Sequence, residues 1–225
     1  MSLQYLNCHN RLLRSDTGKA EEPLGHVHCV VAGRPEVLGA PRILSLDQAT
    51  GAATPLVPLS YVGFPVLGDP RVNAMEADPD TGVIVGEFGK ILKTVDGGQS
   101  WVDKSSDRGI TLLAVAFSDD LNGFAVGLDG LLLKTEDTGE SWTVCETGIQ
   151  QHLFGILWDG KQWLSVGADG FIGYGDPTCE SWEFKKLSEM DWGWHTAAAK
   201  LSKGYLIVGA TQGIWHNGNW SYLGS

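Results

Sequence analysis

Short runs of alternating apolar and polar residues, separated by Gly or Asp, follow one another along most of the chain. The clearest series comprises residues 111–119, 123–130, 131–137 and 141–147. A period of two predicts β-strands, and the glycines and aspartates between the runs predict tight turns. No apolar pattern with helical spacing persists along the chain. The pattern therefore predicts an all-β protein.

The same series of strands recurs about every 40 residues. Three stretches align without gaps, VGEFGKILKTVDGGQSW (85–101), VGLDGLLLKTEDTGESW (126–142) and VGADGFIGYGDPTCESW (166–182), and a fourth, VGATQGIWHNGNWSYL, begins at Val208. A period of this length, with four antiparallel strands in each repeat, is typical of the blades of a β-propeller. We predict a single β-propeller domain covering residues 1–225.

Weaker copies of the repeat precede the clear ones. Residues 26–33 look like a first strand and 42–51 like a third strand with its turn, whereas 3–10, 11–18 and 19–25 look like strands two to four of an earlier blade. The sequence therefore predicts about six four-stranded blades with an incomplete first blade. The alternative is five blades with an N-terminal hairpin. We expect the ring to close, because an open array exposes unpaired strand edges.

Two repeats carry the spacing S/T-x-D-x-G-x-x-W between their third and fourth strands. The motif residues are Thr94, Asp96, Gly98 and Trp101 in one copy, Thr135, Asp137, Gly139 and Trp142 in the other, and Trp182 alone in register in a third. A turn Asp and a Thr hydroxyl accept hydrogen bonds from nearby amides, and Gly supplies a positive φ. The Trp ring fills space against the sheet, and its indole N–H needs a partner. These roles are structural, so we expect the motif to support the fold and not catalysis.

The motif resembles the Asp-box, also called the bacterial neuraminidase repeat, which in that family lies away from the central axis. The longer phrase VGxxGxIxKTxDGGxxW is also similar to the repeat of the photosystem II stability and assembly-factor propellers. Domains of that type occur in bacterial and phage proteins as well. The resemblance implies a β-propeller fold. Those assembly factors are generally longer, carry an export signal and use an arginine-rich face, whereas this sequence shows neither signal nor face.

Charge and cysteine content narrow the classes of partner. The formal net charge is −11, and an acidic surface repels phosphates, so we expect no nucleic-acid partner. The sequence shows no signal-peptide pattern and no apolar stretch of transmembrane length, so we expect cytoplasmic synthesis without membrane insertion. Cys8, Cys29, Cys145 and Cys179 lie far apart without CxxC spacing. We expect buried free thiols, no metal and no cofactor.

Enzymatic activity is the next question, because sialidases share the Asp-box. Their chemistry needs an arginine cluster, a Tyr–Glu nucleophile pair and an acidic Asp. The arginines of this chain are scattered, and no GxSxG, HExxH, P-loop or dinucleotide motif is present. We therefore predict that the protein is not an enzyme, and a sialidase-like glycosidase is the least favoured alternative.

Propellers usually bind ligands on the face where the first strand of each blade begins. The connections that lead into those strands contain the residues that we expect to contact a ligand or partner: Tyr61, Phe64, Arg71, Gln151, His152, Trp192, Trp194 and His195. Trp192 and Trp194 belong to no Asp-box, and two aromatics on one loop supply contact area at low entropic cost. The alternative is that both rings plug the channel or cap the neighbouring blade.

These features together predict a non-enzymatic binding or assembly module in a larger protein complex. By analogy, the complex is a phage virion or tail-associated structure, and the partners are its other protein subunits. The alternative is a carbohydrate-binding propeller in which Trp192, Trp194 and Tyr61 stack on sugar rings.

Overall fold

The computed structural model describes residues 80–223 in full. Before residue 80 it describes five strands, which are β1 (Leu6–Asn7), β2 (His26–Val31), β3 (Arg42–Asp47), β4 (Ala53–Pro58) and β5 (Val72–Ala77). Tyr61, Phe64 and Arg71, which we predicted to contact a partner, lie outside the described residues.

The described strands form five antiparallel sheets of four strands each. β1–β4 make the first sheet, and the second contains β5, β6 (Gly82–Gly86), β7 (Ile91–Thr94) and β8 (Val102–Asp103). The third contains β9 (Leu112–Phe117), β10 (Gly123–Gly127), β11 (Leu132–Thr135) and β12 (Thr143–Cys145). The fourth contains β13 (Leu153–Trp158), β14 (Trp163–Gly167), β15 (Phe171–Gly175) and β16 (Glu183–Lys186). The fifth contains β17 (His195–Lys200), β18 (Tyr205–Gly209), β19 (Gln212–His216) and β20 (Asn219–Tyr222).

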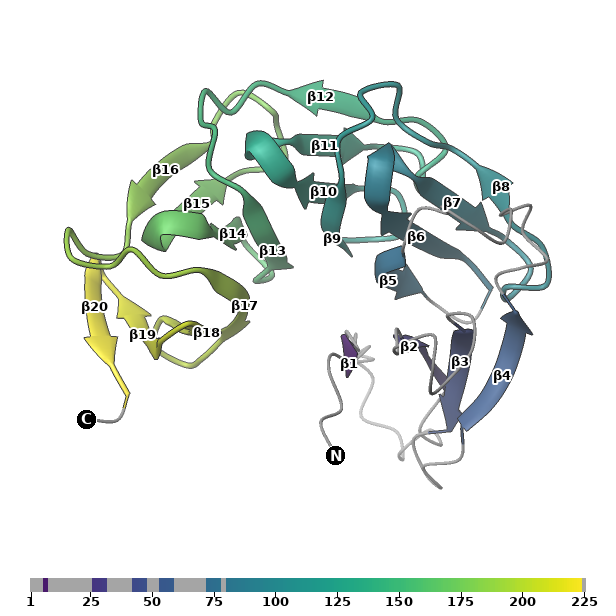
Figure 1. Cartoon of the computed structure of the whole chain (residues 1–225), viewed down its shortest axis with the longest axis horizontal. Helices are drawn as coiled ribbons and strands as arrows, with labels where there is room; N and C mark the ends of the chain where they lie inside the picture. The colour runs from purple at the N-terminus through teal and green to yellow at the C-terminus, as the bar shows by residue number, and fades with distance from the viewer. Residues whose placement is uncertain are drawn as a thin grey trace.

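The sheets follow one another around an arc, and Figure 1 shows the first and fifth sheets at its two ends. β5, β9, β13 and β17 lie on the inner side of the arc and pack against one another in chain order. The predicted all-β propeller is therefore confirmed. No helix in the described part of the chain is long and apolar enough to cross a membrane.

The number of sheets matches the five-blade alternative. Within residues 3–25 the structure describes one strand, Leu6–Asn7, and it pairs with His26–Val31 in the first sheet. In this sheet the strand order is β1-β2-β3-β4, so Arg42–Asp47 is a third strand as predicted, whereas His26–Val31, predicted to be a first strand, is the second. His26–Val31 also packs beside β5, in the same way as the second strands β6, β10 and β14 pack beside the inner strand of the following sheet.

Large side chains from adjacent sheets interlock to form the core. Between the third and fourth sheets, Phe124 meets Trp163 edge-on at 5.0 Å and Trp182 at 5.4 Å between ring centroids. Phe124 and Trp163 are fully buried. Burial of such aromatic side chains contributes about 1.5–3 kcal/mol each to stability, so the stacking of successive sheets stabilises the fold.

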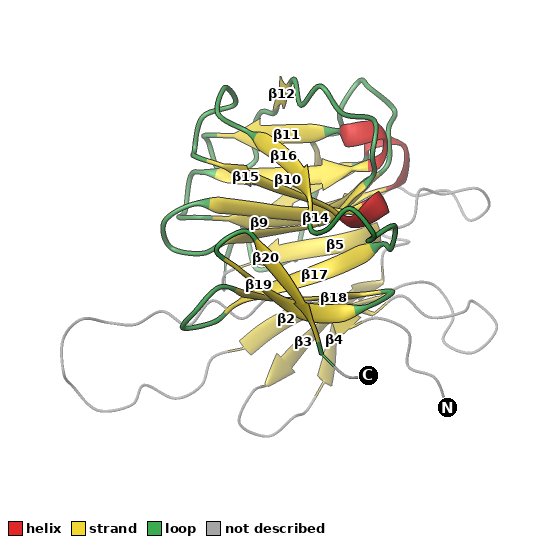
Figure 2. Cartoon of the chain, turned by 90° about the vertical axis from the view of Figure 1, so that its left-hand side faces the viewer, coloured by secondary structure: helices red, strands yellow, loops and turns green. Residues whose placement is uncertain are grey.

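Each of the middle sheets joins its second and third strands through a 3-10 turn with a residue in the left-handed region. The turns are Glu87–Gly89, Leu128–Gly130 and Ala168–Gly170, and their central residues Phe88, Asp129 and Asp169 have φ of 55°, 54° and 56°. The turns (red in Figure 2) lie at the same end of the sheets. The connections into the next inner strand pack against them, because the Ser106 amide donates to the Gly89 carbonyl and the Leu187 amide to that of Gly170.

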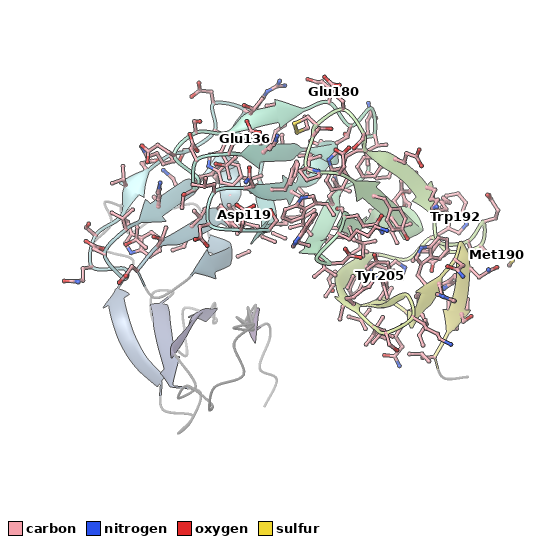
Figure 3. All side chains as sticks on the ribbon, turned by 180° about the vertical axis from the view of Figure 1, so that it is seen from behind. Asp119, Glu136, Glu180, Met190, Trp192 and Tyr205 are labelled. Atoms are coloured by element: carbon pink, nitrogen blue, oxygen red, sulfur yellow. A yellow bond between two sulfur atoms is a disulfide. The ribbon has the colours of Figure 1, made fainter. Side chains whose placement is uncertain are left out.

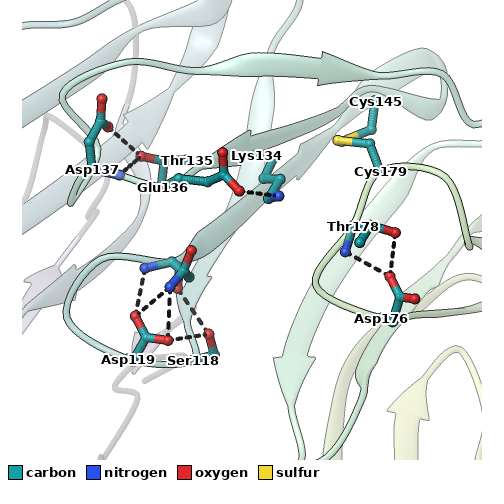
Figure 4. Close-up of polar contacts among 11 residues, drawn as sticks. Ser118, Asp119, Lys134, Thr135, Glu136, Asp137, Cys145, Asp176, Thr178 and Cys179 are labelled. Carbon is teal, nitrogen blue, oxygen red and sulfur yellow. Dashed lines mark hydrogen bonds and ion pairs between the residues drawn. A yellow bond between two sulfur atoms is a disulfide. The ribbon is translucent and has the colours of Figure 1, made fainter.

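The Asp-box turns lie at the opposite end of the strands and are closed by one repeated set of hydrogen bonds. Asp137 accepts from the Thr135 hydroxyl at 2.8 Å and from the Ser141 amide at 2.9 Å, and the Gly139 amide donates to Thr135 at 2.8 Å. Figure 4 shows the Thr135–Asp137 contact. Gly139 has φ of 76°, and a Cβ there would lie 2.7 Å from a Val83 methyl group.

Thr94, Asp96 and Gly98 make the equivalent contacts in the second sheet. There the Ser100 amide and hydroxyl donate to Asp96, and with Thr94 they lower the pKa of Asp96 to about 2. Trp101 donates its indole N–H to the Gly98 carbonyl at 3.2 Å. The buried indole N–H groups of Trp142 and Trp182 have no partner among the described residues, contrary to the expectation for this motif.

The prediction of free thiols at Cys145 and Cys179 was wrong, because the two residues form a disulfide. Cys145 ends β12, and Cys179 lies in the turn of the fourth sheet at the position that a box glycine occupies in the intact repeats. Figure 4 shows the bond between these neighbouring sheets. No local pattern predicts this bond, because the two cysteines are 34 residues apart and meet only when the sheets stack.

Candidate functional site

The predicted contact residues in the described part of the chain fall into two groups at the end of the sheets that carries the 3-10 turns. Trp192 and Trp194 belong to the connection from β16 to β17, and His195 begins β17. Gln151 and His152 belong to the connection from β12 to β13. The two connections are bonded to the same turn, because the Ala168 amide donates to the His152 carbonyl and the Gly170 amide to the Gly193 carbonyl.

The loop between β16 and β17 closes on itself through a buried carboxylate. Asp191 accepts a hydrogen bond from the Gly193 amide at 2.8 Å through Oδ1, and its Oδ2 lies 3.2 Å from Nε2 of His195. Asp191 and His195 are both buried. We name this pair the Asp191–His195 clasp. It fixes both ends of the segment that carries Trp192 and Trp194.

The turns of two sheets hold the backbone of the same loop. The Gly170 amide donates to the Gly193 carbonyl at 2.7 Å, and the Ala210 amide donates to the Trp194 carbonyl at 2.7 Å. Gly170 has φ of 69°, and a Cβ at this position would lie 2.5 Å from the Asp191 carbonyl oxygen. The loop is therefore tied to the fourth and fifth sheets at once, and only glycine fits at the first contact.

Large apolar side chains project outward from this anchored backbone. Met190, Trp192 and Trp194 are 87%, 70% and 49% exposed, and we call these three residues the aromatic platform. Figure 3 shows Met190 and Trp192 next to each other at the outer edge of the molecule. The Lys186 ammonium lies 3.0 Å from the centre of the Trp192 ring, which places that ring beside the outer strand β16. Trp192 therefore lies toward the rim and does not plug a central channel.

His152 is hydrogen-bonded to the 3-10 turn Leu128–Gly130 of the third sheet. Its Nδ1 accepts a hydrogen bond from the Asp129 amide at 3.0 Å, so in the neutral ring the proton sits on Nε2. The Ala168 amide donates to the His152 carbonyl at 2.8 Å. Gln151 is half-buried next to it. These contacts hold the connection between the third and fourth sheets in place, and they are distinct from those of the clasp.

Some residues that shape the platform were absent from the sequence prediction of contact residues. They are Lys186, Met190, Asp191 and Gly193. For Asp191 a signal existed, because an Asp two residues before a Gly commonly accepts the hydrogen bond of that Gly amide. Lys186 gave none, because its contact with Trp192 depends on how the loop folds back over β16.

The described residues around the platform offer apolar contact surface. Within residues 80–223 no group of three His, Cys, Asp or Glu side chains is placed to hold a metal ion. An open pocket of about 460 Å³ lies elsewhere, beside the Cys145–Cys179 bond. Its lining includes Lys134, Asp137 and Glu180, and it belongs to the Asp-box end of the sheets.

Comparisons with known proteins agree with this architecture. The family model described as "Photosynthesis system II assembly factor YCF48" matches residues 69–156. Over these residues the chain resembles YCF48, and its fold is that of a β-propeller. No curated protein matches the sequence.

Solved structures of YCF48 share the fold. The structure titled "YCF48 bound to D1 peptide" superposes with a TM-score of 0.63 at 18% identity, over 90% of this chain and 66% of that chain. YCF48 from Cyanidioschyzon merolae gives a TM-score of 0.56 at 18% identity, over 72% of this chain and 59% of that one. A computationally designed protein, Ika8, gives 0.59 at 15% identity, over 88% and 57%. This chain thus spans less than two thirds of each of these proteins.

Proposed function

We propose that the chain is a non-enzymatic propeller module that binds a segment of a partner protein through the aromatic platform. The observation that carries this proposal is the pair of exposed tryptophans on a loop fixed by the Asp191–His195 clasp. Rigid, exposed aromatic side chains lose little entropy when a partner covers them, and Trp is enriched among residues that dominate binding energy.

The similarity to YCF48 supports the same kind of role. One YCF48 structure is titled as bound to a D1 peptide, which makes peptide binding by a protein of this fold a reasonable model. The partner of this chain would then be a protein segment that places an apolar or aromatic side chain between Trp192 and Trp194. An arginine cluster of the sialidase kind cannot be assembled from residues 80–223, because Arg108 is the one arginine there.

Peptide selection followed by affinity measurement tests the proposal. A library of random peptides displayed on phage is selected against the protein, and the Kd of each enriched peptide is measured by calorimetry. Trp194→Ala and Trp192→Ala should each weaken binding at least about tenfold, as expected for the loss of a central aromatic contact. Tyr222→Ala is the matched control, because Tyr222 is also an exposed aromatic, 53% exposed, on the last strand.

Two outcomes would contradict the proposal. One is a set of enriched peptides that bind both tryptophan variants as tightly as the wild type. The other is specific binding on a glycan array that Trp194→Ala abolishes, which would support the carbohydrate-binding alternative.

The wider setting is part of the same proposal. We propose that the partner is another subunit of a larger complex, with a phage virion or tail as the setting that analogy with propeller domains of phage proteins offers. Mass spectrometry of purified particles from the native source tests this setting. Recovery of the chain only as a free protein, absent from particles, would contradict it.

A further inference from the structure

The Cys145–Cys179 disulfide joins two residues whose surroundings differ. Cys145 ends β12, is 3% exposed and belongs to the core that contains Phe124 and Trp163. Cys179 lies in the turn between β15 and β16 and is partly exposed. One end of the bond is therefore enclosed by the core, and the other end lies near solvent.

The repeat explains why residue 179 reaches the third sheet. In the intact repeat the equivalent residue is Gly139, where a Cβ would lie 2.7 Å from a Val83 methyl group of the second sheet. A side chain at this position thus points at the preceding sheet. Cys179 carries such a side chain, and it bonds to Cys145 of the sheet before its own.

The fold around the bond also has contacts that do not involve its sulfur atoms. Within the turn, Asp176 accepts hydrogen bonds from the Thr178 amide at 2.7 Å and from the Thr178 hydroxyl at 2.6 Å, as Figure 4 shows. The Asp176 amide donates to the Ser181 hydroxyl at 3.1 Å. Between the sheets, the ring centroids of Phe124 and Trp182 lie 5.4 Å apart. The bond can thus open while the two sheets stay in contact.

An open pocket gives solvent access to one end of the bond. Its volume is about 460 Å³, and its lining includes Cys179 but not Cys145. The Lys134 ammonium in the lining lies 2.6 Å from a carboxylate oxygen of Glu136, and these two charges offset each other. The carboxylates of Asp137 and Glu180 line the pocket as well and leave it negatively charged.

We infer that this pocket is a site of thiol–disulfide exchange, through which a small thiol attacks Sγ of Cys179 and opens the bond in the folded protein. Exchange proceeds by attack of a thiolate on one sulfur of a disulfide, and its rate depends on access to that sulfur. Access is through Cys179, because Cys145 is buried and lies outside the pocket lining. The bond is then a reversible link between the third and fourth sheets.

Each step of the exchange balances. The incoming thiolate forms a new S–S bond with Sγ of Cys179, the Cys145–Cys179 bond breaks, and its electron pair goes to Sγ of Cys145, which takes up a proton. A second molecule of the thiol attacks the outer sulfur of the mixed disulfide, which leaves Cys179 as a thiol and releases the small thiol as its own disulfide. The small thiol is oxidised, and the protein disulfide is reduced. Because Cys145 stays beside Cys179, its thiolate can also attack the mixed disulfide and restore the original bond.

The charge of the pocket selects the class of thiol. The attacking form of cysteamine carries an ammonium and a thiolate and has no net charge, whereas that of 3-mercaptopropionate carries a carboxylate and a thiolate. Like charges repel across a few ångströms, and salt screens this repulsion. The carboxylates of Asp137 and Glu180 therefore disfavour an anionic thiol. We expect thiols that carry an amino group to be the preferred class.

Exchange rates of the full chain with these two thiols test the inference. The protein is mixed with excess thiol, and samples are quenched with acid and mapped by mass spectrometry of their peptides. The rate of opening should rise in proportion to the thiol concentration, with the first adduct on Cys179 and the free thiol on Cys145. Glu180→Gln should lower the ratio of the cysteamine rate constant to the 3-mercaptopropionate rate constant at least about twofold at low salt. Comparing this ratio between proteins cancels the intrinsic reactivities of the two thiols.

Glu189→Gln is the matched control, because Glu189 is exposed on the loop between β16 and β17, at the opposite end of the sheets. It should leave the ratio unchanged. An opening rate that does not depend on thiol concentration would overturn the inference, because opening would then wait for unfolding. A first adduct on Cys145, or the same ratio in Glu180→Gln and in the wild type, would overturn it as well. The readout needs no peptide, so its failure is separate from a failure of the proposed function.

Discussion

Nε2 of His195 lies 3.2 Å from Oδ2 of Asp191, and both side chains are buried beneath the loop that exposes Trp192 and Trp194. The same carboxylate also accepts the Gly193 amide. One buried acid thus contacts two groups, on residues two and four positions after it in the chain. This arrangement makes the aromatic platform a preformed surface and not a pair of tryptophans on a mobile loop.

Replacing the shared carboxylate should loosen the platform. Asp191→Ala leaves the Gly193 amide and the His195 ring without their acceptor in a buried place, at an expected cost of about 1–3 kcal/mol of unfolding free energy. Tryptophan fluorescence should become more accessible to acrylamide. Glu189→Ala, at an exposed position of the same loop, is the control and should change neither stability nor quenching. Unchanged quenching in a folded Asp191→Ala protein would show that the clasp does not hold the tryptophans.

The Asp-box carboxylates should matter for folding and not for binding. Asp137 accepts bonds from Thr135 and from the amide and hydroxyl of Ser141, so Asp137→Ala should lower the free energy of unfolding by about 1–3 kcal/mol. Denaturant titration measures this loss. Glu136→Ala, whose side chain is exposed next to it, should have little effect. Weaker peptide binding by a fully stable Asp137→Ala protein would contradict this prediction. It would place the binding site at the Asp-box end of the sheets, opposite to the platform.

The fold could be predicted from the sequence because the repeat is visible in it. The alternation in 111–147 and the recurring VG and KT-D-G-W phrases depend on local turn chemistry and on core filling, which every blade must repeat. The Cys145–Cys179 bond escaped prediction for the opposite reason, since it joins two sheets and has no counterpart in the other repeats within residues 80–223.

The candidate site could be predicted only in part from the sequence. Trp192 and Trp194 stood out because no Asp-box explains them. Their grouping with Met190 and the contact of Trp192 with Lys186 depend on the path of one loop over the outer strand β16. His152 supports a turn of the preceding sheet, and its carbonyl accepts the amide of Ala168 in the turn that also holds Gly193. The part of Gln151 and His152 in binding stays a prediction.

Stability in acid should depend on Asp159, which links the fourth and fifth sheets. Burial raises the pKa of Asp159, but hydrogen bonds from Tyr205, the Gln162 amide and Lys200 together outweigh it and lower the pKa to about 2. Since the folded pKa lies below that of an unfolded Asp, about 3.9, the contribution is complete above about pH 4. It is lost as the pH falls toward 2. Denaturation midpoints measured against pH should fall over this window.

Asp159→Asn removes the charge and isolates its share of that acid sensitivity. The variant should be less stable than the wild type at pH 7, and the difference between the two proteins should shrink as the pH falls below 4. A difference that stays constant with pH would mean that the carboxylate charge contributes nothing to the contact between the sheets.

The disulfide should stabilise the contact between the third and fourth sheets. It closes a loop with a sequence separation of 34 residues, for which chain entropy gives about 3–4 kcal/mol of unfolding free energy. A reducing agent should therefore lower the melting temperature of the wild type. The Cys145→Ser, Cys179→Ser double variant should melt at the lower temperature and should not respond to the reductant. Equal responses of the two proteins would locate the redox-sensitive bond elsewhere.

Hydroxyl-radical footprinting of the protein with and without a bound peptide tests the central claim most directly, because Met and Trp are readily oxidised and the platform consists of both. Protection should concentrate on Met190, Trp192 and Trp194, while Tyr222 on the last strand keeps its rate of modification. Protection confined to the rim residues Val95, Val102 or Leu121, with the three platform residues modified as fast as in the free protein, would contradict the account.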